Sequence, residues 1–214
     1  MSLQSAISNP KSEIEKMNIQ MVISGVGGQG VLLVTRIIAA IALQAGYPLI
    51  GSEDHGMSQR GGSVMTHLKI GDFNSPLVKK GNGDILLSLE KDEAYKTLHY
   101  LKPAIEGKKG GLGFINAEDP NYMNTQVREY LRKQGIETHI FGADRAAKEM
   151  GSVQSTNIAL IGFASAHPRF PFSRETLRVA IEQVTPIKFR DTSLRIFDRC
   201  HAEGKKRIKV PSDG

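Results

Sequence analysis

The chain has 214 residues, of which 40% are hydrophobic and 23% charged, values typical of one soluble globular domain. Its single cysteine, Cys200, excludes an internal disulfide framework, an iron–sulfur cluster ligated by this chain alone and a cysteine-rich zinc site. No apolar run reaches about 18 residues free of charge, so we expect no membrane span. The net charge of +6 comes without a nucleic-acid-binding motif, so we expect no nucleic-acid partner.

The first seventy residues show the hydrophobic patterns of alternating strands and a helix. A β-prone segment runs into Gly25, an almost wholly apolar helix follows and ends at Gly46, and a later segment alternates apolar and polar residues. The expected elements are a strand at 18–24, a helix at 31–45, a short strand at 47–50, a loop at 52–62 and a strand at 63–70.

The same alternation continues to about residue 150 and is followed by helices alone. We expect strands at 84–89, 111–116 and 138–141, and helices at 90–101, 126–134, 143–150, 156–166, 173–184 and 192–202. In the helix at 126–134, Val127, Tyr130 and Leu131 are expected to face inward, and Ser173 is expected to cap its helix.

This order of elements predicts an α/β fold, a single-domain, Rossmann-like three-layer sandwich with a mostly parallel sheet. We divide the chain into a flexible N-terminal lead at 1–17, the folded domain at 18–204 and a basic flexible tail at 205–214. The reducing compartment implied by one cysteine favours a cytoplasmic location.

A glycine-rich turn joins the first strand to the first helix. It is a GxGxxG sequence, in which we single out as candidate ligand-binding residues Gly25, Gly27, Gly28, Gln29 and Gly30. The helix N-terminus that follows offers free N–H groups to an anion. Glu53 and Asp54 lie about twenty residues further on, where an adenosine ribose would need an acid. NAD(P) or FAD binding, another phosphate-bearing ligand, a partner subunit, and a turn without a ligand all remain open.

A second glycine-containing loop follows at 55–62. Its candidate ligand-binding residues are Ser58, Gln59, Arg60, Gly61 and Gly62, and Arg60 is its only cation. A guanidinium group binds phosphate or carboxylate through two parallel hydrogen bonds. We expect this loop to lie close to the first glycine turn, at the sheet edge where α/β proteins bind ligands. A solvated surface loop is the alternative interpretation.

Other side chains give no convincing catalytic or metal site. Cys200 and His201 are neighbours on an expected helix, so they cannot face each other. The remaining histidines lack metal-ligand spacing, and no G-x-S-x-G or Walker A sequence occurs. We therefore assign no catalytic residue and no metal ligand.

The two glycine loops and several later segments resemble the gamma-type subunits of 2-oxoacid:ferredoxin oxidoreductases. The form of the second loop points to the indolepyruvate ferredoxin oxidoreductase branch, to its small (beta) subunits. The resemblance covers roughly residues 18–204 and rests on the segments 25–31, 55–64, 75–77, 84–90 and 156–162.

This resemblance implies one subunit of a larger enzyme that converts an aryl 2-oxoacid, coenzyme A and oxidised ferredoxin into acyl-CoA, carbon dioxide and reduced ferredoxin. Thiamine diphosphate and the iron–sulfur clusters are then expected in a large (alpha) partner subunit, coenzyme A is a cosubstrate, and this chain binds no cofactor alone. The hypotheses that compete with it are a stand-alone NAD(P)- or FAD-binding oxidoreductase and a purely structural or regulatory binding protein.

Overall fold

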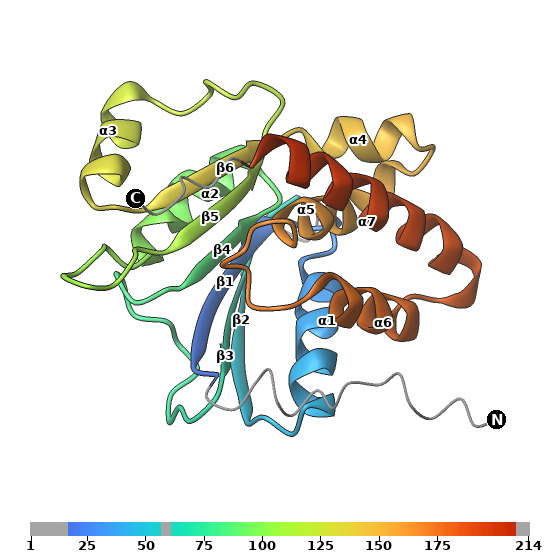
Figure 1. The fold of residues 1–214 in the computed structure, drawn as a ribbon, viewed down its shortest axis with the longest axis horizontal. Coiled ribbons are helices and arrows are strands. Elements are labelled where there is room, and N and C mark those ends of the chain that lie inside the picture. Colours follow the sequence, from blue (N-terminus) through green and yellow to red (C-terminus); the bar gives the residue numbers. More distant parts are fainter. Residues whose placement is uncertain (1–16, 57–60, 209–214) are drawn as a thin grey trace.

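A computed structural model describes residues 17–56 and 61–208. A six-stranded sheet lies at the centre in the order β2-β3-β1-β4-β5-β6, with helices on both of its faces (Figure 1). Strands β1, β4, β5 and β6 are parallel to their neighbours in this group, whereas β3 runs antiparallel to both β1 and β2. The predicted mostly parallel, three-layer α/β sandwich is therefore confirmed.

The strands and helices follow the predicted order. The strands are β1 (Ile19–Val26), β2 (Leu49–His55), β3 (Ser63–Ile70), β4 (Ile85–Ser88), β5 (Leu112–Asn116) and β6 (Glu137–Phe141). The α-helices are α1 (Val31–Gln44), α2 (Lys91–Thr97), α3 (Thr125–Lys133), α4 (Ala143–Glu149), α5 (Thr156–Ala164), α6 (Arg174–Val184) and α7 (Ile187–Arg207).

Two hydrophobic cores lie on the two faces of the sheet. In β1, Met21 and Ile23 point into the core shared with α1, α5, α6 and α7, while Val22 between them points into the core shared with α2 and α3. Leu86 in β4 and Ile115 in β5 join Val22 in the second core. Because both faces are covered, these strands carry apolar residues on both sides, as the sequence pattern indicated, and the polar Ser24, Ser88 and Asn116 lie toward their carboxyl ends.

Helix α5 is the most buried helix, and its residues are buried all round. It lies between the sheet and α7 in Figure 1, so neither of its sides faces water. A helix in that position has no polar face to display, which explains its nearly continuous apolar sequence.

Three expected boundaries need correction. Strand β2 starts at Leu49 and runs to His55, so residues 52–55, expected in a loop, pair with β3 instead. Helix α7 is much longer than expected, because it begins at Ile187 and continues through Arg207. The first three residues of the expected tail, 205–207, are therefore helical, and the remaining residue ranges 1–16 and 209–214 lie outside the described residues.

Tyr130 is a further correction. It was expected to face inward from α3, yet 60% of its surface is exposed, whereas Leu131 beside it is buried. Ser173 does cap α6 as predicted, since its hydroxyl oxygen accepts a hydrogen bond from the backbone N–H of Thr176 at 3.2 Å. In the part of the chain that the structure describes, every helix is too short or too polar to span a membrane.

Candidate functional site

The two glycine loops meet at the carboxyl end of β1. Strands β2 and β3 form a hairpin, and the first residue of β3, Ser63, pairs with Val26 at the end of β1. The backbone N–H of Gly27 donates a hydrogen bond to the carbonyl oxygen of Gly62 at 2.9 Å. The predicted proximity of the loops is therefore confirmed. They meet at the carboxyl ends of the strands, where parallel α/β sheets bind ligands.

Packing inside the protein explains why positions 25 and 30 of the turn are glycine. A Cβ atom on Gly25 would lie 2.8 Å from the side-chain oxygen of Gln29 and 3.1 Å from Leu89. Gln29 folds back on the turn, where its side-chain oxygen accepts a hydrogen bond from the N–H of Val26 at 2.9 Å. A Cβ atom on Gly30 would overlap the side-chain amide of Asn157, which donates to the Gly30 carbonyl. These residues shape the turn from within.

The other glycines present their backbone to the outside. Gly27, Gly28 and Gly61 are exposed, and Gly62 beside them is half-buried. Gly28 and Gly61 have φ angles of 98° and 75°, and a Cβ atom added to either would meet no atom of the described residues within 4 Å. We call these four residues the glycine surface. At Gly28 and Gly61 the left-handed backbone conformation explains the choice of glycine. The open space beside them leaves room for another molecule to approach.

Helix α1 begins next to the glycine surface. Its N-cap residue is Gly30, no described side chain caps it, and its first turn holds no acidic residue. No carboxylate within the first turn therefore neutralises the positive end of the helix dipole, and the carboxylate of Glu90 accepts from the side-chain amide of Gln29 at 3.4 Å. This arrangement suits an anionic group such as a phosphate.

Hydrogen bonds of one buried side chain, Asn116, fix the frame around the turn. Asn116, at the end of β5, donates to the carbonyl of Leu89 at 3.0 Å and to the carboxylate of Asp144 at 2.9 Å. The side-chain oxygen of Asn116 accepts from the N–H of Ala143 at 2.9 Å, which anchors the start of α4. The carboxyl ends of β4 and β5 are thereby held in one place, beside the turn.

Glu53 and Asp54 do not take the position that a dinucleotide site requires. Both are exposed residues of β2, at the outer edge of the sheet. In a dinucleotide-binding unit, the strand that carries the ribose-binding acid lies directly beside the first strand. Here β3 lies between β1 and β2, so the ribose role considered for these acids is not supported by the topology.

The remaining candidates of the second loop, Ser58, Gln59 and Arg60, lie outside the described residues. The described ends of the hairpin are joined by the N–H of Gly56, which donates to the carbonyl of Ser63 at 2.8 Å.

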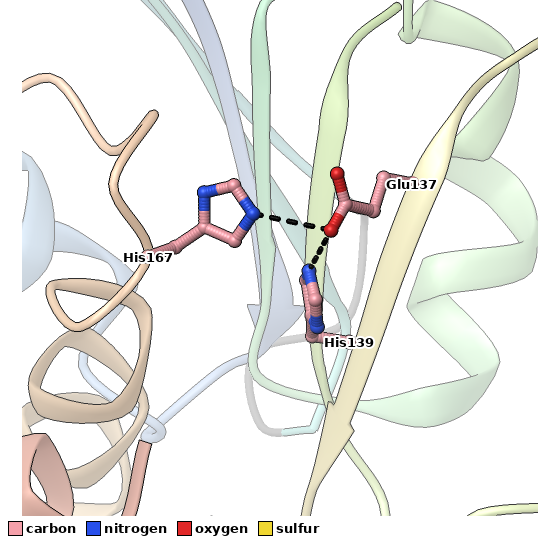
Figure 2. Close-up of side chains that lie close together, drawn as sticks. All are labelled: Glu137, His139 and His167. Carbon is pink, nitrogen blue, oxygen red and sulfur yellow. Dashed lines mark hydrogen bonds and ion pairs between the residues drawn. The ribbon is translucent and has the colours of Figure 1, made fainter. Parts of the chain in front are cut away.

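A cluster that sequence spacing did not reveal lies on the edge strand β6. Glu137 and His139 belong to β6, while His167 follows α5, and their side-chain ligand atoms lie within 4.8 Å of one another. Figure 2 shows one carboxylate oxygen of Glu137 between the two rings. It lies 2.8 Å from Nε2 of His139 and 3.1 Å from Nε2 of His167. A separation of 28 positions between the histidines, which we had treated as scattered, concealed this group in the sequence.

Hydrogen bonding accounts for the cluster better than a metal ion. The N–H of Arg169 donates to Nδ1 of His167 at 3.1 Å, so the proton of the neutral ring is on Nε2, where a metal would need a free electron pair. Nη1 of Arg169 also lies 3.3 Å from the second oxygen of Glu137. This guanidinium places a positive charge beside the site and disfavours a cation there.

The same contacts determine how the cluster titrates. Burial lowers the pKa of both His139 and His167 below the ordinary value, although the charge of Glu137 opposes this. Burial works to raise the pKa of Glu137, but hydrogen bonds and charge from the two histidines outweigh it and lower the pKa. The neutral imidazoles and the ionised carboxylate are therefore the forms favoured by folding.

Comparison with known proteins identifies the family of the chain. Residues 20–203 match the family model described as pyruvate ferredoxin/flavodoxin oxidoreductase. The chain belongs to this family.

Relatives with assigned names agree within the family. The chain is 37% identical over 191 residues to the indolepyruvate oxidoreductase subunit IorB of Thermococcus kodakarensis, a match that covers 83% of this chain and 92% of that protein. It is 36% identical, with the same coverage, to the subunit of that name from Pyrococcus horikoshii. The family match at residues 20–203 includes both glycine loops.

Solved structures of lower identity share the fold. A keto/oxoacid ferredoxin oxidoreductase gamma subunit from Geobacter sulfurreducens superposes with a TM-score of 0.67 at 22% identity, over 88% of this chain and 99% of that one. A 2-oxoglutarate:ferredoxin oxidoreductase from Magnetococcus marinus gives a TM-score of 0.69 at 18% identity, over 91% of this chain and 32% of that one. This member of the family thus has the fold of the gamma subunits.

Cys200, the only cysteine of this oxidoreductase-family chain, lies in the core. Burial raises the pKa of its thiol to about 12, so the nucleophilic thiolate is scarce at neutral pH. The side chain of the neighbouring His201 contacts Ser165 instead, and its Nδ1 lies 2.8 Å from the hydroxyl oxygen of that residue. Neither residue contributes to the glycine surface.

Proposed function

We propose that this chain is the small subunit of a 2-oxoacid:ferredoxin oxidoreductase that depends on thiamine diphosphate and iron–sulfur clusters. Its substrate is indolepyruvate or another aryl pyruvate, which is decarboxylated oxidatively with coenzyme A to give acyl-CoA and carbon dioxide, while ferredoxin takes up the electrons. Family membership and the names of the relatives at 36–37% identity support this proposal.

The hydrogen bond between Gly27 and Gly62 is the structural observation that best supports this proposal. The two loops on which the resemblance rests are far apart in the sequence, and this contact brings them together at the carboxyl end of the sheet. A shared surface built from both loops is what a joint role in ligand or subunit binding requires.

The glycine surface and the start of α1 are proposed to bind an anionic group, a phosphate of coenzyme A, with help from Ser58, Gln59 and Arg60. Exposed backbone at Gly27, Gly28 and Gly61, together with an uncapped helix N-terminus, fits such a group. Within the described residues this surface offers backbone groups rather than a nucleophile or a general base. Its role is binding and orientation.

The chemistry of the reaction is proposed to reside in a large partner subunit. Thiamine diphosphate supplies the carbanion chemistry of decarboxylation when bound, and iron–sulfur clusters carry the electrons toward ferredoxin. One buried cysteine cannot ligate a cluster, which supports this division of labour. The small subunit alone is then inactive. We propose a cytoplasmic location for the complex, which the low cysteine content supports.

Co-expression with a thiamine-binding large subunit tests the proposal. The complex is expected to reduce an electron acceptor in the presence of both indolepyruvate and coenzyme A, whereas each subunit alone is inactive. Omitting coenzyme A and replacing indolepyruvate with 2-oxoglutarate are the controls. Equal activity of the large subunit with and without this chain would contradict a role for the chain in turnover.

A further inference from the structure

Glu93 is a buried carboxylate that points toward the candidate site. Only 8% of its side chain is exposed, and it is the third residue of α2. A glutamate at this helix position often returns to the backbone N–H of the N-cap residue. Here one oxygen of Glu93 instead accepts hydrogen bonds from the Ser63 hydroxyl at 2.8 Å and from Nζ of Lys96 at 2.6 Å.

Ser63, Glu93 and Lys96 form a closed triangle, because Nζ of Lys96 also contacts the Ser63 hydroxyl at 2.9 Å. The hydroxyl therefore donates to the carboxylate and accepts from the ammonium group. Two partners of opposite charge fix the orientation of this small side chain more firmly than either could alone.

The backbone around Ser63 connects this triangle to the glycine surface. The carbonyl of Ser63 accepts from Gly56, which closes the hairpin, and the preceding carbonyl, that of Gly62, accepts from Gly27. A shift of Ser63 would therefore displace both the hairpin base and the hydrogen bond that joins the two glycine loops.

We propose that Glu93 is a positioning residue, which with Lys96 holds Ser63 in place and thereby sets the position of the glycine surface for coenzyme A binding. The inference rests on the proposed function of that surface. Glu93 acts through Ser63, since its own carboxylate is buried behind the hairpin base.

Stability alone does not explain a carboxylate at this position. Taking a carboxylate out of water is costly, and an ion pair with a partner such as Lys96, whose side chain is 60% exposed, contributes little to stability. Helix α2 is already anchored in the second core by Ala94, and Leu98, the residue after its end, packs in the same core. The ion pair at Glu93 adds something that an apolar residue could not, a directed contact with the Ser63 hydroxyl.

The test uses the complex of this chain with its large subunit and compares Glu93→Met, Glu93→Gln, Ser63→Ala and Ser63→Thr. Methionine matches the volume of glutamate but accepts no strong hydrogen bond, whereas glutamine keeps an acceptor oxygen and threonine keeps the hydroxyl. Glu149→Gln is the matched control, because it removes a carboxylate paired with Arg199 between α4 and α7, apart from the hairpin.

We expect Glu93→Met and Ser63→Ala to raise the KM for coenzyme A about tenfold, the effect of one lost charge-assisted hydrogen bond. Their unfolding midpoints should stay near that of the wild type. Glu93→Gln and Ser63→Thr should recover most of the loss, and Glu149→Gln should leave KM unchanged. Amide hydrogen exchange in the segments 25–30 and 61–63 and at Gly56 should be faster in Glu93→Met and Ser63→Ala only.

Unchanged exchange and KM in both Glu93→Met and Ser63→Ala would overturn the inference, as would a loss of activity that follows only the loss of folded protein. An inactive wild-type complex would count against the proposed function instead. In that case the exchange measurement still decides whether Glu93 holds the glycine surface.

Discussion

The backbone N–H of Gly27 lies 2.9 Å from the carbonyl oxygen of Gly62, and this contact makes one surface from two loops. It forms because β3 returns antiparallel beside β1, so that the start of β3 meets the end of β1. If β3 ran parallel to β1, the start of β3 would lie beside the start of β1, at the opposite end of the strands. The hairpin that interrupts the parallel order is therefore the structural basis of the candidate site.

Gly28 and Gly30 should tolerate alanine to different degrees. Both have left-handed φ angles, but in the part of the chain that the structure describes only Gly30 has a neighbour, Asn157, in the space that a Cβ atom would take. We expect Gly28→Ala to lower the free energy of unfolding by about 1 kcal/mol and Gly30→Ala by about 3 kcal/mol. Urea unfolding of the purified chain measures both values. Equal losses would contradict the packing role of Gly30.

Arg60→Ala should weaken the complex or its turnover while leaving the fold intact. A guanidinium group that binds phosphate or carboxylate through two hydrogen bonds contributes about 2 kcal/mol, which corresponds to roughly a thirtyfold change in affinity. We expect the KM for coenzyme A or the dissociation constant of the large subunit to rise by this factor. Arg60→Lys retains the charge but not the two parallel hydrogen bonds, so its KM or dissociation constant should lie between those of the wild type and Arg60→Ala. Wild-type values in Arg60→Ala would remove this residue from the site.

Acidification should destabilise the protein through the Glu137 cluster. The pKa values of His139 and His167 are lowered by burial, so below the ordinary imidazole value of 6.5 the unfolded chain binds protons that the folded chain does not. The free energy of unfolding is therefore greatest above about pH 7 and falls toward pH 5. Glu137, whose pKa is also lowered, adds a further loss below its ordinary value of 4.5.

Urea unfolding at a series of pH values measures this dependence. Burial also lowers the pKa of three other histidines, His67, His99 and His201, so the test compares slopes rather than single values. The double variant with glutamine at positions 139 and 167 should show a shallower slope between pH 7 and pH 5. A slope equal to that of the wild type would show that the cluster does not contribute.

Cys200 should resist alkylation in the native protein. Burial hides its sulfur and raises its thiol pKa to about 12, so at pH 8 roughly one thiol in ten thousand is ionised. We expect iodoacetamide to modify it slowly in buffer and rapidly in urea, with mass spectrometry following the reaction. Fast modification of the folded chain would show that this part of α7 opens readily.

Much of the fold was predictable because its elements have clear hydrophobic periods. The mostly apolar strands and the mostly apolar helix α5 indicate burial on both sides, and Ser173 marks the start of α6 correctly. Errors arose where the pattern is polar. Strand β2 extends through Glu53 to His55 because β3 supplies its hydrogen bonds, which a local sequence pattern does not reveal. Tyr130 fits a helical apolar stripe, yet its side chain is exposed while that of Leu131 beside it is buried.

The sequence by itself determined the α/β class, the order of most elements, the family resemblance and the two glycine loops, because these depend on neighbouring residues. Only the tertiary structure decided which distant groups meet. It joined Gly27 to Gly62, set Ser63 on the carboxylate of Glu93, brought His139 and His167 to one oxygen of Glu137, and put β3 between β1 and the acids of β2. Each of these outcomes follows from sheet order and strand direction, which are set by the packing of the whole chain rather than by any local segment.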